Sequence, residues 1–184
     1  MLYLGKQILM LSFFFSTRLI KSLWLILVFF CLPTALPVMA QTPFPPPNQL
    51  QVFNQQGLGF GSFYVGASGG TVVISPGGSR STTGTVMGLA SDPGMPAIFN
   101  VRLIPGRLVH ISFSASATLT RAGGSETMTI TGFTSDKPGN NFVTSGGHPF
   151  INPVQVGGTL NVGSISANPA GNYQGFFEVT FIQE

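Results

Sequence analysis

Alternation of apolar and polar residues runs through the chain after residue 50 and predicts β-strands. In Leu108–Leu119, apolar side chains alternate with serine, threonine and histidine. Such a period of two places successive side chains on opposite faces, so this stretch is predicted to be one half-buried strand. Tyr173–Ile182 shows the same pattern, with Phe177, Val179 and Phe181 on a single face. We expect both stretches to place one face in the core.

Shorter apolar runs predict the remaining strands, and glycine and proline pairs mark the turns between them. The predicted strands are Leu50–Val52, Leu58–Val65, Thr71–Ser75, Arg80–Met87, Ala97–Val101, Thr127–Thr131 and Val154–Val162, the last bent at Gly157–Gly158. No stretch after residue 41 has a helical period. Short strands separated by turns over one domain length predict an all-β sandwich or barrel.

The first forty residues have the order of a secretory signal peptide. Lys6, Arg18 and Lys21 are their only charged residues, an apolar run follows at Leu23–Leu32, and the small-ended triplet Val38–Ala40 completes the pattern. Basic, apolar and small-residue regions in this order are typical of a leader that is cleaved after export. We therefore expect cleavage after residue 40.

A membrane anchor is the alternative to a cleaved leader. The apolar run is shorter than the roughly 20 residues needed to span a bilayer, and Pro33 and Pro37 would break a longer helix. Met1 and Met10 both remain possible starts. Cys31 is the only cysteine, so cleavage would leave a chain without a disulfide.

The pattern divides the chain into a signal peptide at 1–40, a proline-rich extended segment at 41–49 and a β-sandwich domain at 50–184. The proline-rich segment is predicted to be a polyproline-like tether, and the alternative is a recognition peptide for a proline-binding module. We expect an exported protein of the periplasm, the cell surface or the extracellular space, with no membrane span in the mature chain.

Composition argues against nucleic-acid binding. The formal charge of the whole chain is +3, but the leader holds three of its eight basic residues, so five basic and five acidic residues remain after cleavage. Phosphate binding needs clustered lysine and arginine, whereas these are scattered. A surface with so few charges favours close contact with copies of the same chain.

Chemistry-bearing residues are isolated in the sequence. His110 and His148 lie far apart, with no close acidic or histidine neighbour, which argues against a metal site. No Gly-x-Ser-x-Gly motif stands between a predicted strand and a helix, as the nucleophile elbow of a hydrolase does. Glu126, Asp136 and Glu178 are the candidates for a carboxylate pair of the kind that hydrolyses glycosides, but no sequence motif pairs two of them. The loop at residues 77–80 is predicted to be a hairpin turn, since the lysine and the helix of a phosphate loop are missing. We expect no enzyme activity, no catalytic residue, no cofactor and no metal.

The candidate assembly strand begins at Leu50 and Val52, whose apolar side chains alternate with Gln49, Gln51 and Asn54. An open sandwich leaves unpaired backbone groups at its edges, and an extended segment from another copy can pair with them. Leu50 and Val52 are therefore the candidate residues for such a donated strand. The alternative is that residues 50–53 pair within their own domain as its first strand.

A binding module for a glycan or another surface protein is the second functional hypothesis. Sugar-binding faces use exposed tryptophan or tyrosine rings. The predicted mature chain lacks tryptophan and has only Tyr64 and Tyr173. Alternating phenylalanines are more typical of a core.

Motifs along residues 58–183 resemble a family of secreted bacterial domains, domain of unknown function 4402. The matching segments are residues 58–63, 70–76, 78–84, 96–101, 128–130, 156–163 and 171–177. This family is similar to the immunoglobulin-like subunits of bacterial pili and to spore-coat-type surface proteins. The resemblance implies a single immunoglobulin-like β-sandwich of antiparallel strands and a structural, fimbria-like role at the surface of a Gram-negative bacterium. It also implies a chaperone and an outer-membrane usher as possible partners, and it supplies no catalytic residues.

Overall fold

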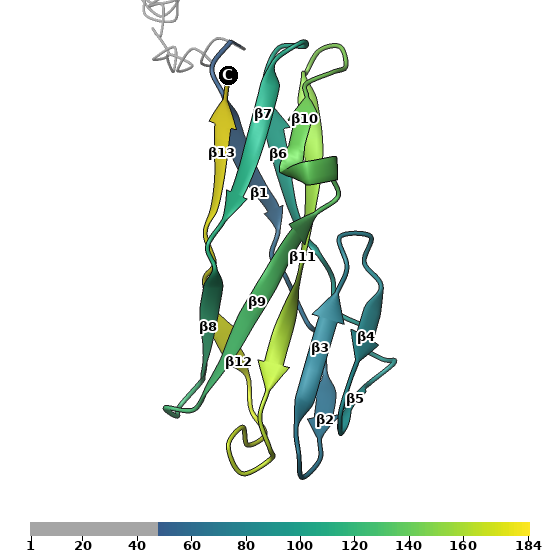
Figure 1. The fold of residues 1–184 in the computed structure, drawn as a ribbon, viewed down its shortest axis with the longest axis vertical. Coiled ribbons are helices and arrows are strands. Elements are labelled where there is room, and N and C mark those ends of the chain that lie inside the picture. Colours follow the sequence, from purple (N-terminus) through teal and green to yellow (C-terminus); the bar gives the residue numbers. More distant parts are fainter. Residues whose placement is uncertain (1–47) are drawn as a thin grey trace, which may run out of the picture. The chain divides into compact units, whose positions relative to one another are not determined.

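The computed structural model describes residues 48–184 (Figure 1). The predicted signal peptide and residues 41–47 of the proline-rich segment lie outside the described residues. In the part of the chain that the structure describes, no helix is long and apolar enough to span a membrane.

Antiparallel strands make up the described domain, so the predicted all-β fold is confirmed. The described residues also contain one short 3-10 helix, Pro138–Asn140. The strands are β1 (Gln51–Gln56), β2 (Phe63–Val65), β3 (Gly70–Ile74), β4 (Arg80–Thr82), β5 (Val86–Gly88), β6 (Ala97–Arg102), β7 (Leu108–Phe113), β8 (Ser116–Arg121), β9 (Thr127–Ser135), β10 (Asn141–Val143), β11 (Ile151–Val162), β12 (Tyr173–Gly175) and β13 (Val179–Gln183).

The long strand β11 organises the largest sheet. The sheet has the order β1-β6-β11-β9-β8-β12, and β3, which also pairs with β4, joins the second half of β11. The first half of β11 pairs with β6, and a register shift against β9 falls between Gly157 and Thr159. The bend predicted at Gly157–Gly158 is therefore present. Smaller sheets β10-β7-β13 and β2-β5 complete the sandwich-like arrangement.

Two stretches predicted as single strands, Leu108–Leu119 and Tyr173–Ile182, are each divided between two sheets. β8 pairs with β12 in the large sheet, whereas β7 pairs with β13 in the three-stranded sheet. The stretches cross together, since the Ser114 N–H donates to the Glu178 carbonyl at the break. The prediction of continuous strands was wrong because alternation records which face is buried, not which sheet a strand joins.

The face assignment in these stretches is confirmed. Ile111, which precedes the break, and Ala117, which follows it, are both buried, and Phe177 and Phe181 pack against the core.

The prediction of a single strand over Arg80–Met87 was wrong. This stretch is two strands, β4 and β5, which pair with different partners on either side of a turn at Gly84, where φ is 68°.

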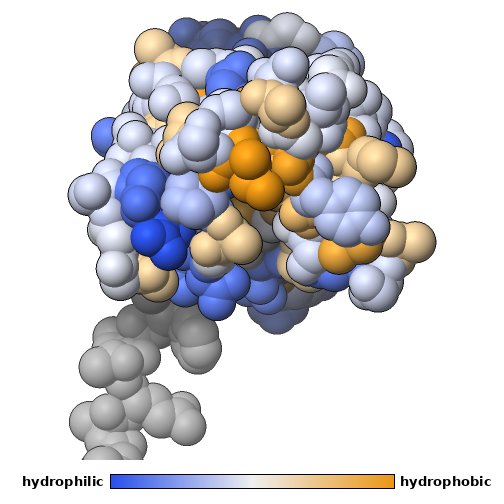
Figure 2. All heavy atoms as spheres, turned by 90° about the horizontal axis from the view of Figure 1, so that it is seen from below, coloured by the Kyte–Doolittle hydropathy of each residue, from blue (hydrophilic) through white to orange (hydrophobic). Residues whose placement is uncertain are grey.

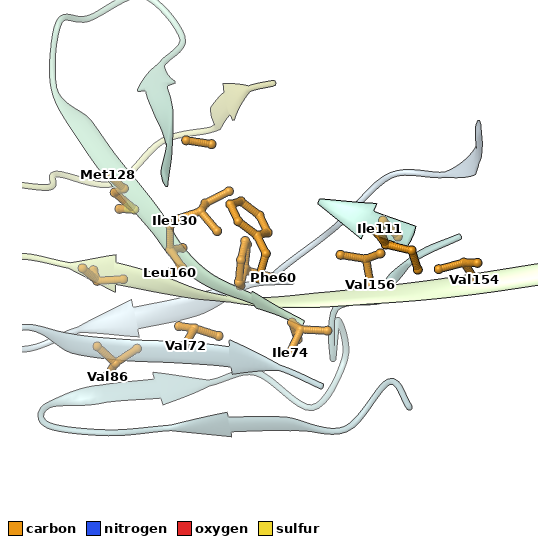
Figure 3. Packing of buried hydrophobic residues seen from close by; sticks show 14 of the residues in the cluster. Phe60, Val72, Ile74, Val86, Ile111, Met128, Ile130, Val154, Val156 and Leu160 are labelled. Atoms are coloured by element: carbon orange, nitrogen blue, oxygen red, sulfur yellow. The ribbon is translucent and has the colours of Figure 1, made fainter. Parts of the chain in front are cut away.

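One continuous core connects the sheets. Figure 3 shows it extending from Met128 and Val86 to Val154 and Ile111, with Phe60 beside Ile130. We call the part formed by β1, β6, β7, β10, β13 and residues 151–156 the closed end. We call the part formed by β2 to β5, β8, β12 and residues 157–162 the groove end. Phe99 of β6 contacts Phe181 of β13 at 5.8 Å between ring centroids, which joins the two sheets of the closed end.

Candidate functional site

A groove of about 780 Å³ opens at the groove end, between residues 58–65 and β12. Its floor is apolar and consists of Leu119 of β8, Met128 and Ile130 of β9 and Leu160 of β11. Its volume lies within the roughly 300–1,000 Å³ typical of ligand pockets. Met128, Ile130 and Leu160 are buried below the groove, so the apolar surface that the groove exposes belongs to its walls and rim, at Met95 and Phe176.

The first wall of the groove has an unpaired strand edge. The Leu89 N–H donates to the Ser62 carbonyl and the Gly66 N–H to the Thr85 carbonyl, in one register with the β2–β5 ladder. Ladder bonds alternate in antiparallel pairs, so Phe63 and Val65 direct their backbone N–H and C=O groups away from β5.

The second wall, β12, has the same property. The Ala122 N–H donates to the Asn172 carbonyl, in register with the β8–β12 pairing. Gln174 therefore faces β8, whereas the backbone groups of Tyr173 and Gly175 point to the other side. In the described chain, β2 and β12 each have one partner strand. The groove thus lies between two edges that keep hydrogen-bonding capacity.

The rim of the groove carries an uncovered aromatic ring. Phe176 is 97% exposed, while the neighbouring Phe177 stacks on Phe133 with ring centroids 5.0 Å apart. Figure 2 views the molecule from this end and shows hydrophobic side chains gathered at its centre among paler, more polar ones. Exposed apolar patches bounded by polar residues are typical of interaction sites.

Arg80 holds the first wall in place. Its guanidinium donates to the backbone carbonyls of Leu89 at 2.6 Å, Asp92 at 2.7 Å and Ser62 at 3.2 Å. The carboxylate of Asp92 accepts a hydrogen bond from the Ser62 hydroxyl at 2.8 Å. Within residues 48–184, Asp92 is the only charged residue that lines the groove. The site is therefore nearly uncharged, and Arg80 acts on its frame.

Asn168 fixes the loop that leads into β12. The side chain is buried, its Oδ1 accepts from the Gly163 N–H at 2.6 Å and its Nδ2 donates to the Thr127 carbonyl at 2.8 Å. Pro169, to which the Tyr173 hydroxyl donates at 2.9 Å, follows directly. These bonds connect the second wall to β9 and β11.

The predicted assembly residues Leu50 and Val52 lie at the start of β1 and do not line the groove. Val52 is opposite Val101 of β6, so in the single chain this segment pairs within its own domain. Leu50 packs against the core, but Val52 and Phe53 are 40% and 45% exposed. Donation of this strand to another copy stays a prediction.

The two histidines lie in different surroundings and are not brought together with a set of ligands. His110 contacts Asn141 through Nδ1 and Glu184 through Nε2, the latter at 2.9 Å. Both partners come from segments distant in the sequence, so no local pattern identifies them. His148 is exposed beside Phe150. Residues 48–184 contain no group of three or more His, Cys, Asp or Glu that could hold a metal.

Two of the candidate carboxylates take part in local structure. Hydrogen bonds from the Arg121 guanidinium, at 2.8 and 3.2 Å, lower the pKa of Glu126 to about 2. Asp136 pairs with Lys137 at 2.8 Å and accepts from the Gln155 N–H. The third, Glu178, is exposed near the crossing between β12 and β13. The structure does not place these three carboxylates in the groove.

Sequence reasoning missed the groove because its walls come from segments more than a hundred residues apart. One sign was present in the sequence. The adjacent Phe176 and Phe177 interrupt the alternation, so one of these two rings has to lie on the outer face of an extended segment.

Comparisons with known proteins place the chain in a family. No curated protein and no solved structure matches it. A family model described as "Domain of unknown function (DUF4402)" matches residues 50–182, which is more than half of the 184 residues. This range covers every strand that forms the groove. The chain therefore belongs to the DUF4402 family.

Proposed function

We propose that this protein is an exported structural subunit of the bacterial cell surface, fimbria-like and without catalytic activity, that assembles with copies of itself or with other surface subunits through strand edges. The observation that carries the proposal is the groove between the unpaired edges of β2 and β12.

Strand addition needs backbone groups that give affinity and pockets that receive alternate side chains. Phe63 and Val65 on one wall and Tyr173 and Gly175 on the other offer the backbone groups. Met128, Ile130 and Leu160 form an apolar floor below them. An extended segment of a partner would therefore gain hydrogen bonds and cover the exposed apolar side chains of Met95 and Phe176 in the same place.

The roles of the ionisable residues support a structural protein. Arg80, Arg121, Glu126 and Asp136 are engaged in bonds that fix turns and the groove wall. A nucleophile with an adjacent base, which covalent catalysis requires, is not among the contacts of the described residues. The fimbria-like role rests on the leader, the low charge and the groove together.

A chaperone and an usher fit this proposal. An exported subunit with an open apolar groove is exposed to aggregation before it assembles. A periplasmic chaperone that adds an extended segment to the groove would protect it, and an outer-membrane usher would then exchange the chaperone for the next subunit.

Binding of a glycan or of another surface protein is the second candidate function. The rings of Tyr173 and Phe176 and the amides of Asn172 and Gln174 lie together around the groove. Aromatic faces with polar neighbours are typical of sugar-binding sites. A binding module would occupy the groove with its ligand and remain monomeric.

The deciding experiment measures the mass of the mature protein, residues 41–184, by size-exclusion chromatography with light scattering over a range of concentrations. We expect multimers whose share rises with concentration. Phe176→Asp should abolish them, because it places a charge at the rim without disturbing the core. Val143→Asp changes an exposed residue of β10, outside the groove, and should leave them intact. A protein that stays monomeric but binds glycans in an array screen would favour the second candidate.

A further inference from the structure

Aromatic side chains line the groove from both walls. Phe63 comes from the first wall, and Tyr173 and Phe176 come from the second. Aromatic-lined grooves recognise proline-rich segments, because a polyproline II helix is already extended and loses little entropy on binding. Asp92 is the only charged side chain among the described residues that line the groove, so a ligand without charged side chains leaves no charge of its own unpaired there.

The chain contains a segment of this kind directly before β1. Residues 42–47 are Thr-Pro-Phe-Pro-Pro-Pro, and residues 41–50 contain no charge. Four of these six residues lack a backbone N–H, so the segment cannot extend the domain's own sheet as a regular strand. Its carbonyl oxygens remain acceptors for the N–H groups that Phe63, Val65 and Tyr173 direct away from their partner strands.

We infer that the groove binds the proline-rich segment Thr42–Pro47 of a second copy of this chain. The inference rests on the proposed function, which it makes specific. It names the occupant of the groove and leaves β1 paired with β6.

The strand register excludes the alternative that the segment fills its own groove. Gln51 pairs with Arg102, and Arg102 pairs with Ile151, so the three residues lie side by side across the sheet. Leu160 on the groove floor lies nine residues further along β11, or about 30 Å away. Thr42 is nine residues from Gln51 and just spans this distance when fully extended, but Pro47 is four residues from Gln51 and reaches at most about 14 Å. The six residues together therefore cannot lie in the groove of their own molecule, and the segment must come from another molecule.

The arrangement links subunits head to tail. In space, β1 begins at the end of the domain where the C-terminus lies, and β2 and β12 lie toward the opposite end (Figure 1). A contact between two different surfaces of identical subunits continues head to tail unless the rotation closes a ring. Each subunit would offer its segment at one end and its groove at the other, as a fibre requires.

The proline-rich segment fits better than β1 as the occupant because β1 already has a place. β1 pairs with β6 from Gln51 to Gln56, and Leu50 packs against the core. Moving β1 would break this ladder and expose the edge of β6. Binding of the preceding segment requires neither change.

The first test replaces residues 42–47 of the mature protein by Ser-Gly repeats of equal length and measures its mass by light scattering. We expect the multimers to disappear, while the melting temperature equals that of the parent at a dilution where the parent is monomeric, because a bound partner stabilises only the multimer. The matched variant Val52→Asp changes β1 and keeps the prolines. Multimers that survive the Ser-Gly replacement but are lost in Val52→Asp would overturn this inference in favour of donated β1 and leave the proposed function standing.

A second test observes the groove directly. Trp24 in the leader is the only tryptophan of the chain, so Phe176→Trp gives the mature protein a single fluorescent reporter at the rim. This variant, carrying the Ser-Gly replacement, is titrated with a synthetic peptide of residues 41–49. We expect a saturable blue shift, and none with a peptide in which the four prolines are alanine. No shift, with multimers intact in the parent, overturns the inference alone. No shift and no multimers overturn the proposed function as well.

Discussion

Phe176 and Phe177 are neighbours in the sequence, yet they belong to different halves of the domain. Phe177 joins the phenylalanine cluster of the closed end, where it stacks on Phe133 and lies 6.3 Å from Phe99. Phe176 stands exposed at the rim of the groove end. At the closed end, facing sheets supply partners for each apolar face. At the groove end, the layer over β9 and β11 is interrupted. The comparison teaches that one half of the sandwich is closed by packed rings, whereas the other half leaves apolar side chains on its surface.

The largest expected effect is on the closed end. Phe133 is 9% exposed and packs against both Phe113 and Phe177, so Phe133→Ala should lower the free energy of unfolding by about 3–5 kcal/mol. Phe176→Ala removes a ring of the same size that is exposed to solvent, so it should leave the free energy of unfolding nearly unchanged. Urea unfolding of both variants checks this. Equal losses would mean that the two ends do not differ in packing.

The next effect concerns the frame of the groove. Arg80→Ala removes charged hydrogen bonds to three wall carbonyls and should lower the free energy of unfolding by about 2–3 kcal/mol. Arg80→Lys keeps the charge but not the planar fork, so it should rescue the loss only in part. Hydrogen exchange should locate the added opening in β2 and β5. Opening in β7 and β13 instead would contradict this role.

Two buried asparagines, one at each end of the domain, allow the effect of the same Asn→Ala substitution to be compared between the closed end and the groove end. Asn168→Ala leaves the Gly163 N–H and the Thr127 carbonyl without their side-chain partner, which should lower the free energy of unfolding by about 1–3 kcal/mol. Asn152→Ala does the same to the Ser145 N–H at the closed end. Both should lower the melting temperature, but only Asn168→Ala should also weaken multimers in light scattering. Equal loss of multimers would show that assembly follows global stability and not the groove.

The smallest effect is the pH dependence of the Arg121–Glu126 pair at the β8–β9 turn. The pKa of Glu126 is lowered from 4.5 to about 2, so the pair stabilises the fold above about pH 4.5. That contribution is lost as the pH falls from 4.5 toward 2. Melting curves of Glu126→Gln should therefore show a shallower decline over this range than the parent. Glu178→Gln alters an exposed carboxylate and should keep the parent's slope; a shallower slope there would contradict the assignment to Glu126.

Much of the fold could be predicted from local pattern. Alternation identified the buried faces of Leu108–Leu119 and Tyr173–Ile182, and Gly157–Gly158 marked the bend in β11. Both depend on residues close in sequence, since the side-chain period of a strand is local. The same pattern could not show that each stretch crosses between sheets, because a crossing keeps the inner face inside.

The sequence by itself determined that the described domain is built from β-strands, which apolar side chains face its core, and that few charges cover its surface. The tertiary structure alone decided that residues 58–65 and 173–176 become two walls of one groove. It also decided that His110 meets Glu184 and that Arg80 binds the backbone carbonyls of the groove wall. The physical reason is that strand pairing and the gaps between strands join residues far apart along the chain. No periodicity within a single segment records which distant segment will lie beside it.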